Sequence, residues 1–128
     1  MSNEDYLYHY TSEEGYEGIK KTGKINRSVK TDDDVTYGID KTYLTSRNPE
    51  TSTPKEIAKS NYDGLPQYAE SMLPRTKVAI AFDRKEINAE EVDPDRKIHT
   101  VKGDLEMSKA KHIYRSQNDE YYKKDEGN

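Results

Sequence analysis

Two short segments of the chain combine residue types that suit a ligand-binding site. The first, Tyr6–Thr11, places His9 among aromatic residues, and the second, Thr42–Ser46, contains Tyr43. An imidazole ring donates or accepts a hydrogen bond, and a tyrosine ring offers a flat face to a planar or cationic group. If both segments are strands that meet in the fold, His9 and Tyr43 would lie at the mouth of one cleft.

The local sequence predicts that the first segment is a strand followed by a helix. Alternation places Leu7 and His9 on one face of the strand and the tyrosines on the other. The run Thr11-Ser12-Glu13-Glu14 fits a capping box with Thr11 as the N-cap. Gly23 suits the left-handed residue that follows a helix. The histidine is therefore expected at a corner between strand and helix.

The remaining elements predict an α+β fold. The run Thr53-Pro54-Lys55-Glu56 forms a second capping box, with Pro54 at the first helical position, where its missing N–H costs nothing. Thr76–Phe82 is the most hydrophobic run and predicts a buried strand, with large side chains on one face and two alanines on the other, where another group can approach closely. Residues 97–101 and 111–115 predict two more strands. The order is strand, helix, strand, helix and three strands, around a mostly antiparallel sheet.

The composition describes one small, polar domain with a tyrosine-rich core. Of 128 residues, 30% are hydrophobic and 36% are charged, but the net charge is only -4 and 11 tyrosines supply buried ring area. The absence of cysteine excludes disulfides, thiolate metal sites and a cysteine nucleophile. Because the charges are interspersed, electrostatics do not favour nucleic acid as a partner. His99 and His112 lack metal-ligand spacing and are expected at the sheet surface, so no metal is expected.

Residues 1–116 are expected to form the domain, and residues 117–128 a disordered polar tail. In the tail nothing apolar recurs except Tyr121 and Tyr122. The acidic N-terminus does not fit a secretory signal, and no apolar run approaches the roughly 18 residues of a membrane span. We therefore expect a soluble monomer with no membrane partner.

The order of these motifs resembles the ADP-ribosyltransferases of the His-Tyr-Asp signature class. These are small toxin-type domains in the diphtheria toxin and poly(ADP-ribose) polymerase branch of that fold. The resemblance rests on Leu7–Thr11 before a capped helix, Tyr43–Ser46 before Pro49 and a second capped helix, an apolar strand, and Gly103–Ser108. It covers about residues 6–115. It implies a split, mostly antiparallel sheet with two or three helices, and NAD as the substrate.

The resemblance also implies a role for each matched residue of the first two motifs. His9 would hydrogen-bond a ribose of NAD, the backbone of Tyr10 would hold the nicotinamide carboxamide, and Thr11 would be a ribose neighbour. Tyr43 would stack on the nicotinamide ring, whose positive charge favours an aromatic face. The chain departs from better-known members of the branch in having Tyr10 where glycine is common. For His9 a structural hydrogen bond, and for Tyr43 core packing, are the competing interpretations.

Two acids are candidates for the third position. Asp104 would hydrogen-bond the ribose 2′-hydroxyl and stabilise the oxocarbenium-like transition state as nicotinamide leaves. Glu106, two residues on and on the same face of a strand, is the alternative acid. An aspartate stands where glutamate is common, which leaves transfer and hydrolysis both open. Asp104 after Gly103 also fits a turn residue that bonds its own backbone.

The resemblance therefore implies an NAD-dependent mono-ADP-ribosyltransferase acting on a protein or nucleic-acid acceptor. It would be a toxin or effector domain, cytoplasmic or delivered into the cytosol of a target cell. Two alternatives stay open: an NAD glycohydrolase that transfers ADP-ribose to water, and a non-catalytic domain that binds ADP-ribose or a partner protein. Arginine is the less expected acceptor, because no Glu-x-Glu pair is present.

Overall fold

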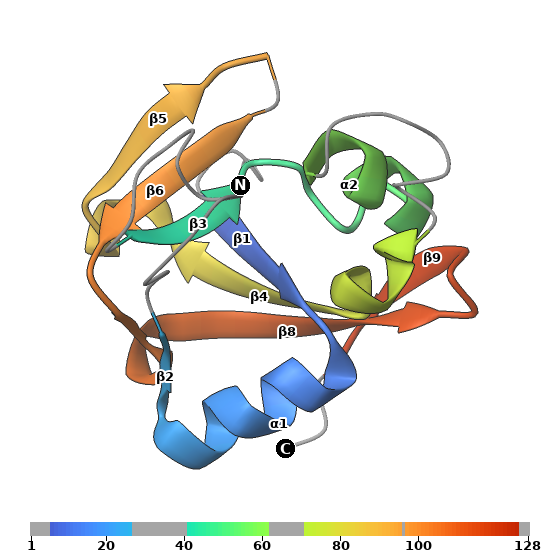
Figure 1. Cartoon of the computed structure of the whole chain (residues 1–128), viewed down its shortest axis with the longest axis horizontal. Coiled ribbons are helices and arrows are strands. Elements are labelled where there is room, and N and C mark those ends of the chain that lie inside the picture. The colour runs from blue at the N-terminus through green and yellow to red at the C-terminus, as the bar shows by residue number, and fades with distance from the viewer. Residues whose placement is uncertain (1–5, 27–40, 62–70, 96, 126–128) are drawn as a thin grey trace.

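The computed structural model of the chain describes residues 6–26, 41–61, 71–95 and 97–125. Within them, seven strands form one antiparallel sheet in the order β5-β6-β3-β1-β4-β8-β9 (Figure 1). The strands are β1 (Tyr6–Thr11), β3 (Lys41–Thr45), β4 (Val78–Asp83), β5 (Ala89–Asp93), β6 (Ile98–Lys102), β8 (Ala110–Gln117) and β9 (Tyr121–Lys124). A separate two-stranded ribbon pairs β2 (Lys24–Ile25) with β7 (Leu105–Glu106).

Two α-helices, with three short 3-10 turns, accompany the strands in the described part of the chain. The α-helices are α1 (Glu13–Thr22) and α2 (Pro54–Asn61), and the 3-10 turns span Leu73–Thr76, Arg84–Glu86 and Met107–Lys109. None of the described helices has the length and apolar character needed to cross a bilayer. The mostly antiparallel α+β arrangement expected from the sequence is confirmed.

The capping of α1 differs by one residue from the prediction. Ser12, not Thr11, is the N-cap, and its Oγ accepts the N–H of Gly15 at 2.9 Å. Thr11 cannot take that role because its backbone still pairs with Val78 at the end of β1. At the other end of the helix the prediction is confirmed, since Gly23 has φ +81 and donates its N–H to the last turn.

The predicted capping box of α2 is confirmed in both directions. The N–H of Thr53 donates to Glu56 Oε1 at 2.9 Å, and the N–H of Glu56 donates to Thr53 Oγ1 at 3.2 Å. Pro54 begins the helix as predicted. Thr53 and Glu56 therefore serve the helix end.

The two faces of the sheet bury different kinds of side chain. On β4, alternation sends Val78, Ile80 and Phe82 into the core that α1 covers, and Ala79 and Ala81 into the other core. This confirms the prediction that one face carries large groups and the other allows close approach. The groups that approach the alanines are Ile57 of α2 and four tyrosines, Tyr8, Tyr10, Tyr114 and Tyr122.

The prediction of a disordered tail is wrong for the residues of the tail that the structure describes, 117–125. Tyr121–Lys124 form β9, which pairs with β8 from Gln117 to Tyr114. The hairpin turns at Asn118 and Asp119, both with positive φ, which Asn and Asp tolerate better than most residues. The ring of Tyr122 is buried and its hydroxyl donates to the carbonyl of Thr76 at 2.7 Å. Residues 126–128 lie outside the described part of the chain.

Candidate functional site

The sheet is split between β1 and β3. β1 pairs with β4 along its whole length, from Tyr6 to Thr11, but its only register pair with β3 among the described residues is Tyr8 with Thr45. β3 in turn pairs with β6 along its whole length. Figure 1 shows β1 and β3 diverging from their shared end. We call this gap in the ladder the β1–β3 split.

His9 lies at the β1–β3 split and is held by the facing strand. Its Nδ1 lies 2.9 Å from the backbone carbonyl oxygen of Tyr43. A carbonyl oxygen only accepts, so Nδ1 carries the proton and donates it. Burial lowers the pKa of His9 from its ordinary 6.5, against the opposing effect of this hydrogen bond. The ring is therefore neutral at pH 7, and its Nε2 is a hydrogen-bond acceptor.

Tyr43 contributes its backbone to His9 and turns its ring elsewhere. Its neighbours Thr42 and Leu44 are each 2% exposed, and Leu44 belongs to the core beneath α1. Alternation therefore places the Tyr43 ring on the other face of β3. The ring is half-buried and belongs to neither of the two clusters of described core residues. Core packing stays the competing interpretation for this tyrosine.

Tyr10 and Thr11 extend β1 beyond His9. The Tyr10 ring is buried, and its hydroxyl donates to the carbonyl of Arg47 at 2.8 Å. The ring thus belongs to the protein core. Thr11 is half-buried, and its Oγ1 occupies the space that a Cβ on residue 15 would need. Gly15 is what allows α1 to start so close to this hydroxyl.

The candidate acids lie beyond the end of β6. Thr42 Oγ1 donates to the carbonyl of Gly103 at 2.7 Å, which ties the start of β3 to the residue before Asp104. The Asp104 carboxylate lies 3.1 Å from Lys24 Nζ, and its side chain is 24% exposed. Glu106 is exposed on β7 and pairs with Lys24 in the ribbon.

The structure thus brings the predicted residues together to different degrees. His9 and the Tyr43 backbone are in direct contact. Asp104 is linked to that pair through Gly103 and Thr42, the residue before Tyr43. Glu106 lies in β7 of the two-stranded ribbon, and Asp104 directly precedes that strand. Neither carboxylate is on a strand beside β1.

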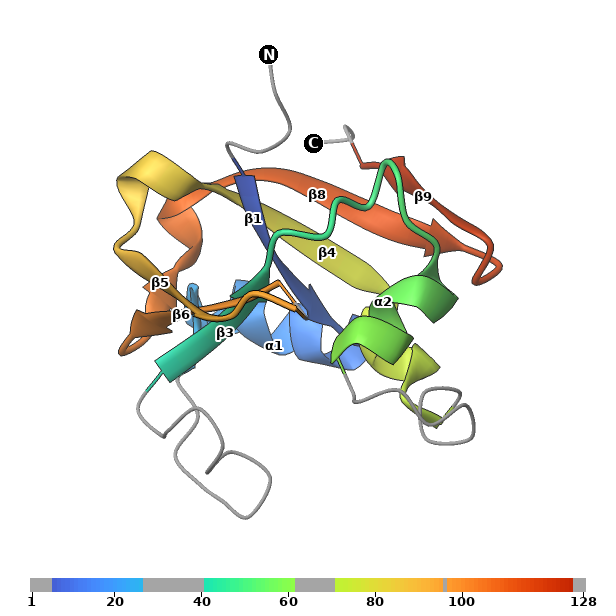
Figure 2. The ribbon, with the colours of Figure 1, turned by 90° about the horizontal axis from the view of Figure 1, so that it is seen from above.

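The segment between β3 and α2 is fastened to the tyrosine face of the sheet. Tyr10 binds the Arg47 carbonyl, and the Tyr114 hydroxyl donates to Glu50 Oε2 at 2.9 Å. Asn48 is buried and its Oδ1 accepts the N–H of Glu50 at 2.8 Å. Figure 2 shows this segment passing from β3 across β1 and β4 toward β9. The tyrosines thereby fix the path of the chain directly after Tyr43.

The sequence did not predict the positions of two further residues. The prediction for His99 was wrong, and Lys24 was not singled out. His99 was expected at the surface but is 5% exposed, because it faces the same core side as Leu44 and lies 3.8 Å from Glu91. Burial, aided by Arg84, lowers its pKa below 6.5, with Glu91 acting in the opposite direction. Lys24 carried no sequence signal, since an isolated lysine after a helix is ordinary.

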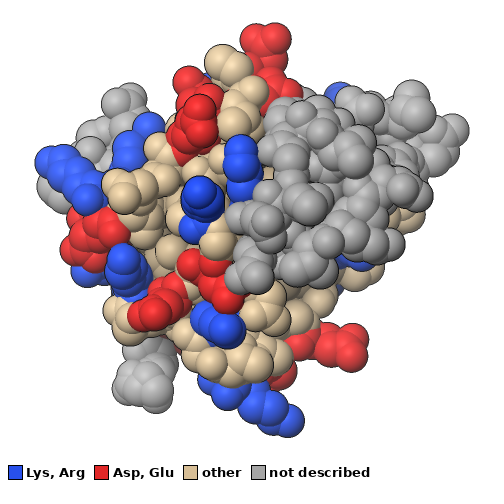
Figure 3. All heavy atoms as spheres, turned by 60° about the vertical axis from the view of Figure 1, so that its left-hand side comes forward, with Lys and Arg blue, Asp and Glu red and all other residues tan. Residues whose placement is uncertain are grey.

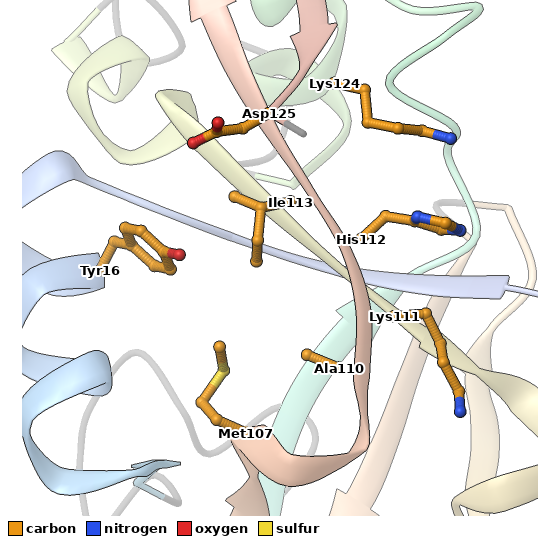
Figure 4. A pocket seen from close by; sticks show the side chains of 8 residues that line it. All are labelled: Tyr16, Met107, Ala110, Lys111, His112, Ile113, Lys124 and Asp125. Carbon is orange, nitrogen blue, oxygen red and sulfur yellow. The ribbon is translucent and has the colours of Figure 1, made fainter. Parts of the chain in front are cut away.

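A pocket of about 240 Å³ lies between α1 and β8, away from the candidate residues. In Figure 4, Tyr16, Met107, Ala110 and Ile113 border the hollow, whereas Lys111, His112 and Lys124 extend on the other side of β8. Its lining residues are Tyr16, Met107, Ala110, Lys111, His112, Ile113, Lys124 and Asp125. Among the described residues, no group of three or more His, Cys, Asp or Glu could hold a metal ion.

Comparison with known proteins identifies the family. No curated protein and no solved structure matched the chain. A family model described as an ADP-ribosyltransferase containing the HYD1 signature matches residues 7–109. The matched region begins just before His9 and includes Tyr43 and both candidate acids. Because it spans most of the chain, the chain belongs to the HYD1-signature family of toxin-type ADP-ribosyltransferases.

Proposed function

We propose that the chain is an NAD-dependent mono-ADP-ribosyltransferase that acts on a macromolecular acceptor, as a toxin domain inside a target cell. The observation that carries the proposal is the position of His9 at the β1–β3 split, with Nδ1 held by the Tyr43 carbonyl. A neutral imidazole fixed in this way offers Nε2 as an acceptor. A ribose hydroxyl is a donor that suits it.

The residues around His9 suit the remaining parts of NAD. The half-buried ring of Tyr43, on the face of β3 opposite Leu44, would offer an aromatic face to the cationic nicotinamide. The Tyr10 ring is engaged with Arg47, so the part of Tyr10 left for the carboxamide is its backbone. Thr11, half-buried at the end of β1, would be the ribose neighbour.

The chemistry needs an anion near the ribose. As the bond from C1′ to the nicotinamide nitrogen breaks, its electron pair leaves with neutral nicotinamide and positive charge develops on the ribose. The acceptor nucleophile supplies the electron pair of the new bond and loses its proton. Asp104 would bind the 2′-hydroxyl and stabilise that positive charge, a contribution of several kcal/mol in a site shielded from water. Glu106 is the alternative acid.

The test is the fate of NAD labelled in its adenosine half. The protein is incubated with NAD and with a cell extract that supplies protein and nucleic-acid acceptors, and released nicotinamide is measured. We expect nicotinamide release together with label on a macromolecule, and loss of both in His9→Ala and Asp104→Asn. Label found only as free ADP-ribose would replace the transferase with an NAD glycohydrolase. Binding of ADP-ribose by calorimetry without nicotinamide release would replace it with a non-catalytic domain.

A further inference from the structure

The β2–β7 ribbon turns one lysine and two carboxylates to the same side. Its register pairs Lys24 with Glu106 and Ile25 with Leu105. Ile25 and Leu105 are each 3% exposed and belong to the core beneath α1. Lys24 and Glu106 therefore point away from that core, and Asp104, two residues before Glu106, shares their side.

The backbone at Lys24 is fixed from both directions. α1 ends at Gly23, whose N–H donates to the carbonyl of Ile19 at 2.8 Å. The hydroxyl oxygen of Thr22 lies 3.0 Å from the carbonyl oxygen of Lys24 and 3.1 Å from that of Gly18, so its one proton is shared between these acceptors. The Gly23 carbonyl accepts the N–H of Met107 at 2.9 Å, which fastens this corner to the end of β7. Figure 1 shows β2 directly after the C-terminal end of α1.

The ammonium of Lys24 lies beside Asp104. Its Nζ lies 3.1 Å from Asp104 Oδ2. Lys24 is 46% exposed, and ion pairs at this exposure contribute little to folding free energy. On the face shown in Figure 3, positive and negative side chains are intermingled among the described residues. What distinguishes Lys24 is its partner, since the acid it contacts is the candidate catalytic residue Asp104.

We propose that Lys24 is a positioning residue for the catalytic acid. This inference rests on the proposed function. By binding the carboxylate, Lys24 restrains the orientation in which Asp104 would meet the ribose 2′-hydroxyl. Its charge also lowers the repulsion between Asp104 and Glu106, which stand on the same side of the ribbon. Lys24 does not touch NAD itself, so its effect should appear in turnover and not in substrate binding.

The test compares Lys24→Met and Lys24→Arg with a matched control, Lys20→Met. Lys20 has the same 46% exposure and pairs with Glu17 at 3.3 Å on the exposed side of α1. Lys24→Met should lower kcat for nicotinamide release about 10-fold without raising KM for NAD, as expected for a misplaced reacting group. Lys24→Arg should restore most of the turnover, and Lys20→Met should match the parent protein. All three should unfold at the parent temperature.

A double variant separates this inference from the proposed function. If Lys24 acts through Asp104, adding Lys24→Met to Asp104→Asn should cause no further loss of kcat. Losses that multiply, or a Lys24→Met protein as active as Lys20→Met while Asp104→Asn is inactive, would overturn the role of Lys24 and leave the transferase intact. Full activity of Asp104→Asn would instead remove Asp104 as the catalytic acid.

Discussion

The imidazole Nδ1 of His9 and the carbonyl oxygen of Tyr43 lie 2.9 Å apart, although 34 residues separate them in the chain. This hydrogen bond crosses the β1–β3 split where the strand ladder is not continued. It fixes both the orientation of the ring and the nitrogen that carries the proton. The two strands that carry His9 and Tyr43 are thus joined by a side chain in place of a ladder bond.

Replacing His9 with asparagine distinguishes the role of Nδ1 from the role of Nε2. The asparagine amide can still donate to the Tyr43 carbonyl, but it has no atom at the position of Nε2. We expect His9→Asn to fold and to lose about 5- to 10-fold in kcat/KM, the equivalent of one hydrogen bond of about 1 kcal/mol. Measuring nicotinamide release over a range of NAD concentrations checks this. Parent-like kcat/KM would show that Nε2 does not contact the substrate.

The depressed pKa of His9 makes folding depend on pH. Because the folded protein resists protonation of this ring, the unfolded chain binds more protons as the pH falls below 6.5. The stabilising contribution is present above that pH and is lost as the pH falls toward the folded pKa. Urea unfolding at pH 7 and at pH 5 should show a smaller loss of unfolding free energy in His9→Gln than in the parent protein. His99→Gln is the parallel variant, since burial also lowers the pKa of His99.

The two candidate acids are distinguished by matched amide substitutions. Asp104 is only 24% exposed and is held by Lys24, whereas Glu106 is exposed on β7. We expect Asp104→Asn to lower kcat at least 100-fold, the scale of a lost transition-state electrostatic contact, and Glu106→Gln to have little effect. Nicotinamide release is the measurement. The reverse pattern would transfer the catalytic role to Glu106.

Two glycines of α1 should respond to alanine in opposite directions. A Cβ at Gly15 would collide with Thr11 Oγ1, whereas a Cβ at Gly18 meets nothing within 4 Å. Gly18→Ala should therefore raise the unfolding free energy by up to about 1 kcal/mol through helix propensity. Gly15→Ala should lower it, and adding Thr11→Ala should recover the loss. Thermal unfolding of the four proteins checks this, and equal effects of the two alanines would contradict it.

The hairpin of β8 and β9 should depend on the hydroxyl of Tyr122. Removing it in Tyr122→Phe leaves the Thr76 carbonyl without its 2.7 Å partner in a buried site, at a cost of about 1 to 3 kcal/mol. Tyr121→Phe is the matched control, since Tyr121 is 56% exposed and should tolerate the change. Urea unfolding of both variants measures the difference. Equal stability of the two would show that β9 adds little.

Local rules predicted the elements of this fold well. The capping box of Thr53 and Glu56, the αL glycine at Gly23 and the two-faced pattern of β4 all depend on a few neighbouring residues, and all are confirmed. The family suggested by the order of the motifs is confirmed too. The α1 cap was wrong by one residue because a long-range pairing with Val78 keeps Thr11 in the strand.

The errors concern residues whose environment is made by distant parts of the chain. Tyr122 sits in a polar segment, and only the alanine face of β4 and the carbonyl of Thr76 give its ring a place. His99 is buried because of its place in the sheet, which its polar surroundings in the sequence do not reveal. Lys24 meets Asp104 only because β2 and β7, about 80 residues apart, share a register.

The single rung between Tyr8 and Thr45 also has a consequence for cooperativity. On one side of it, β1, β4, β8 and β9 form a fully paired unit, and on the other β3, β6 and β5 form a second. Among the described residues the ladder joins the two units at this rung alone, while the core that contains Leu7 and Leu44 links them by packing. A ligand that touches both adds its binding free energy to their coupling. Substrate binding at the split would therefore strengthen the coupling between the two units.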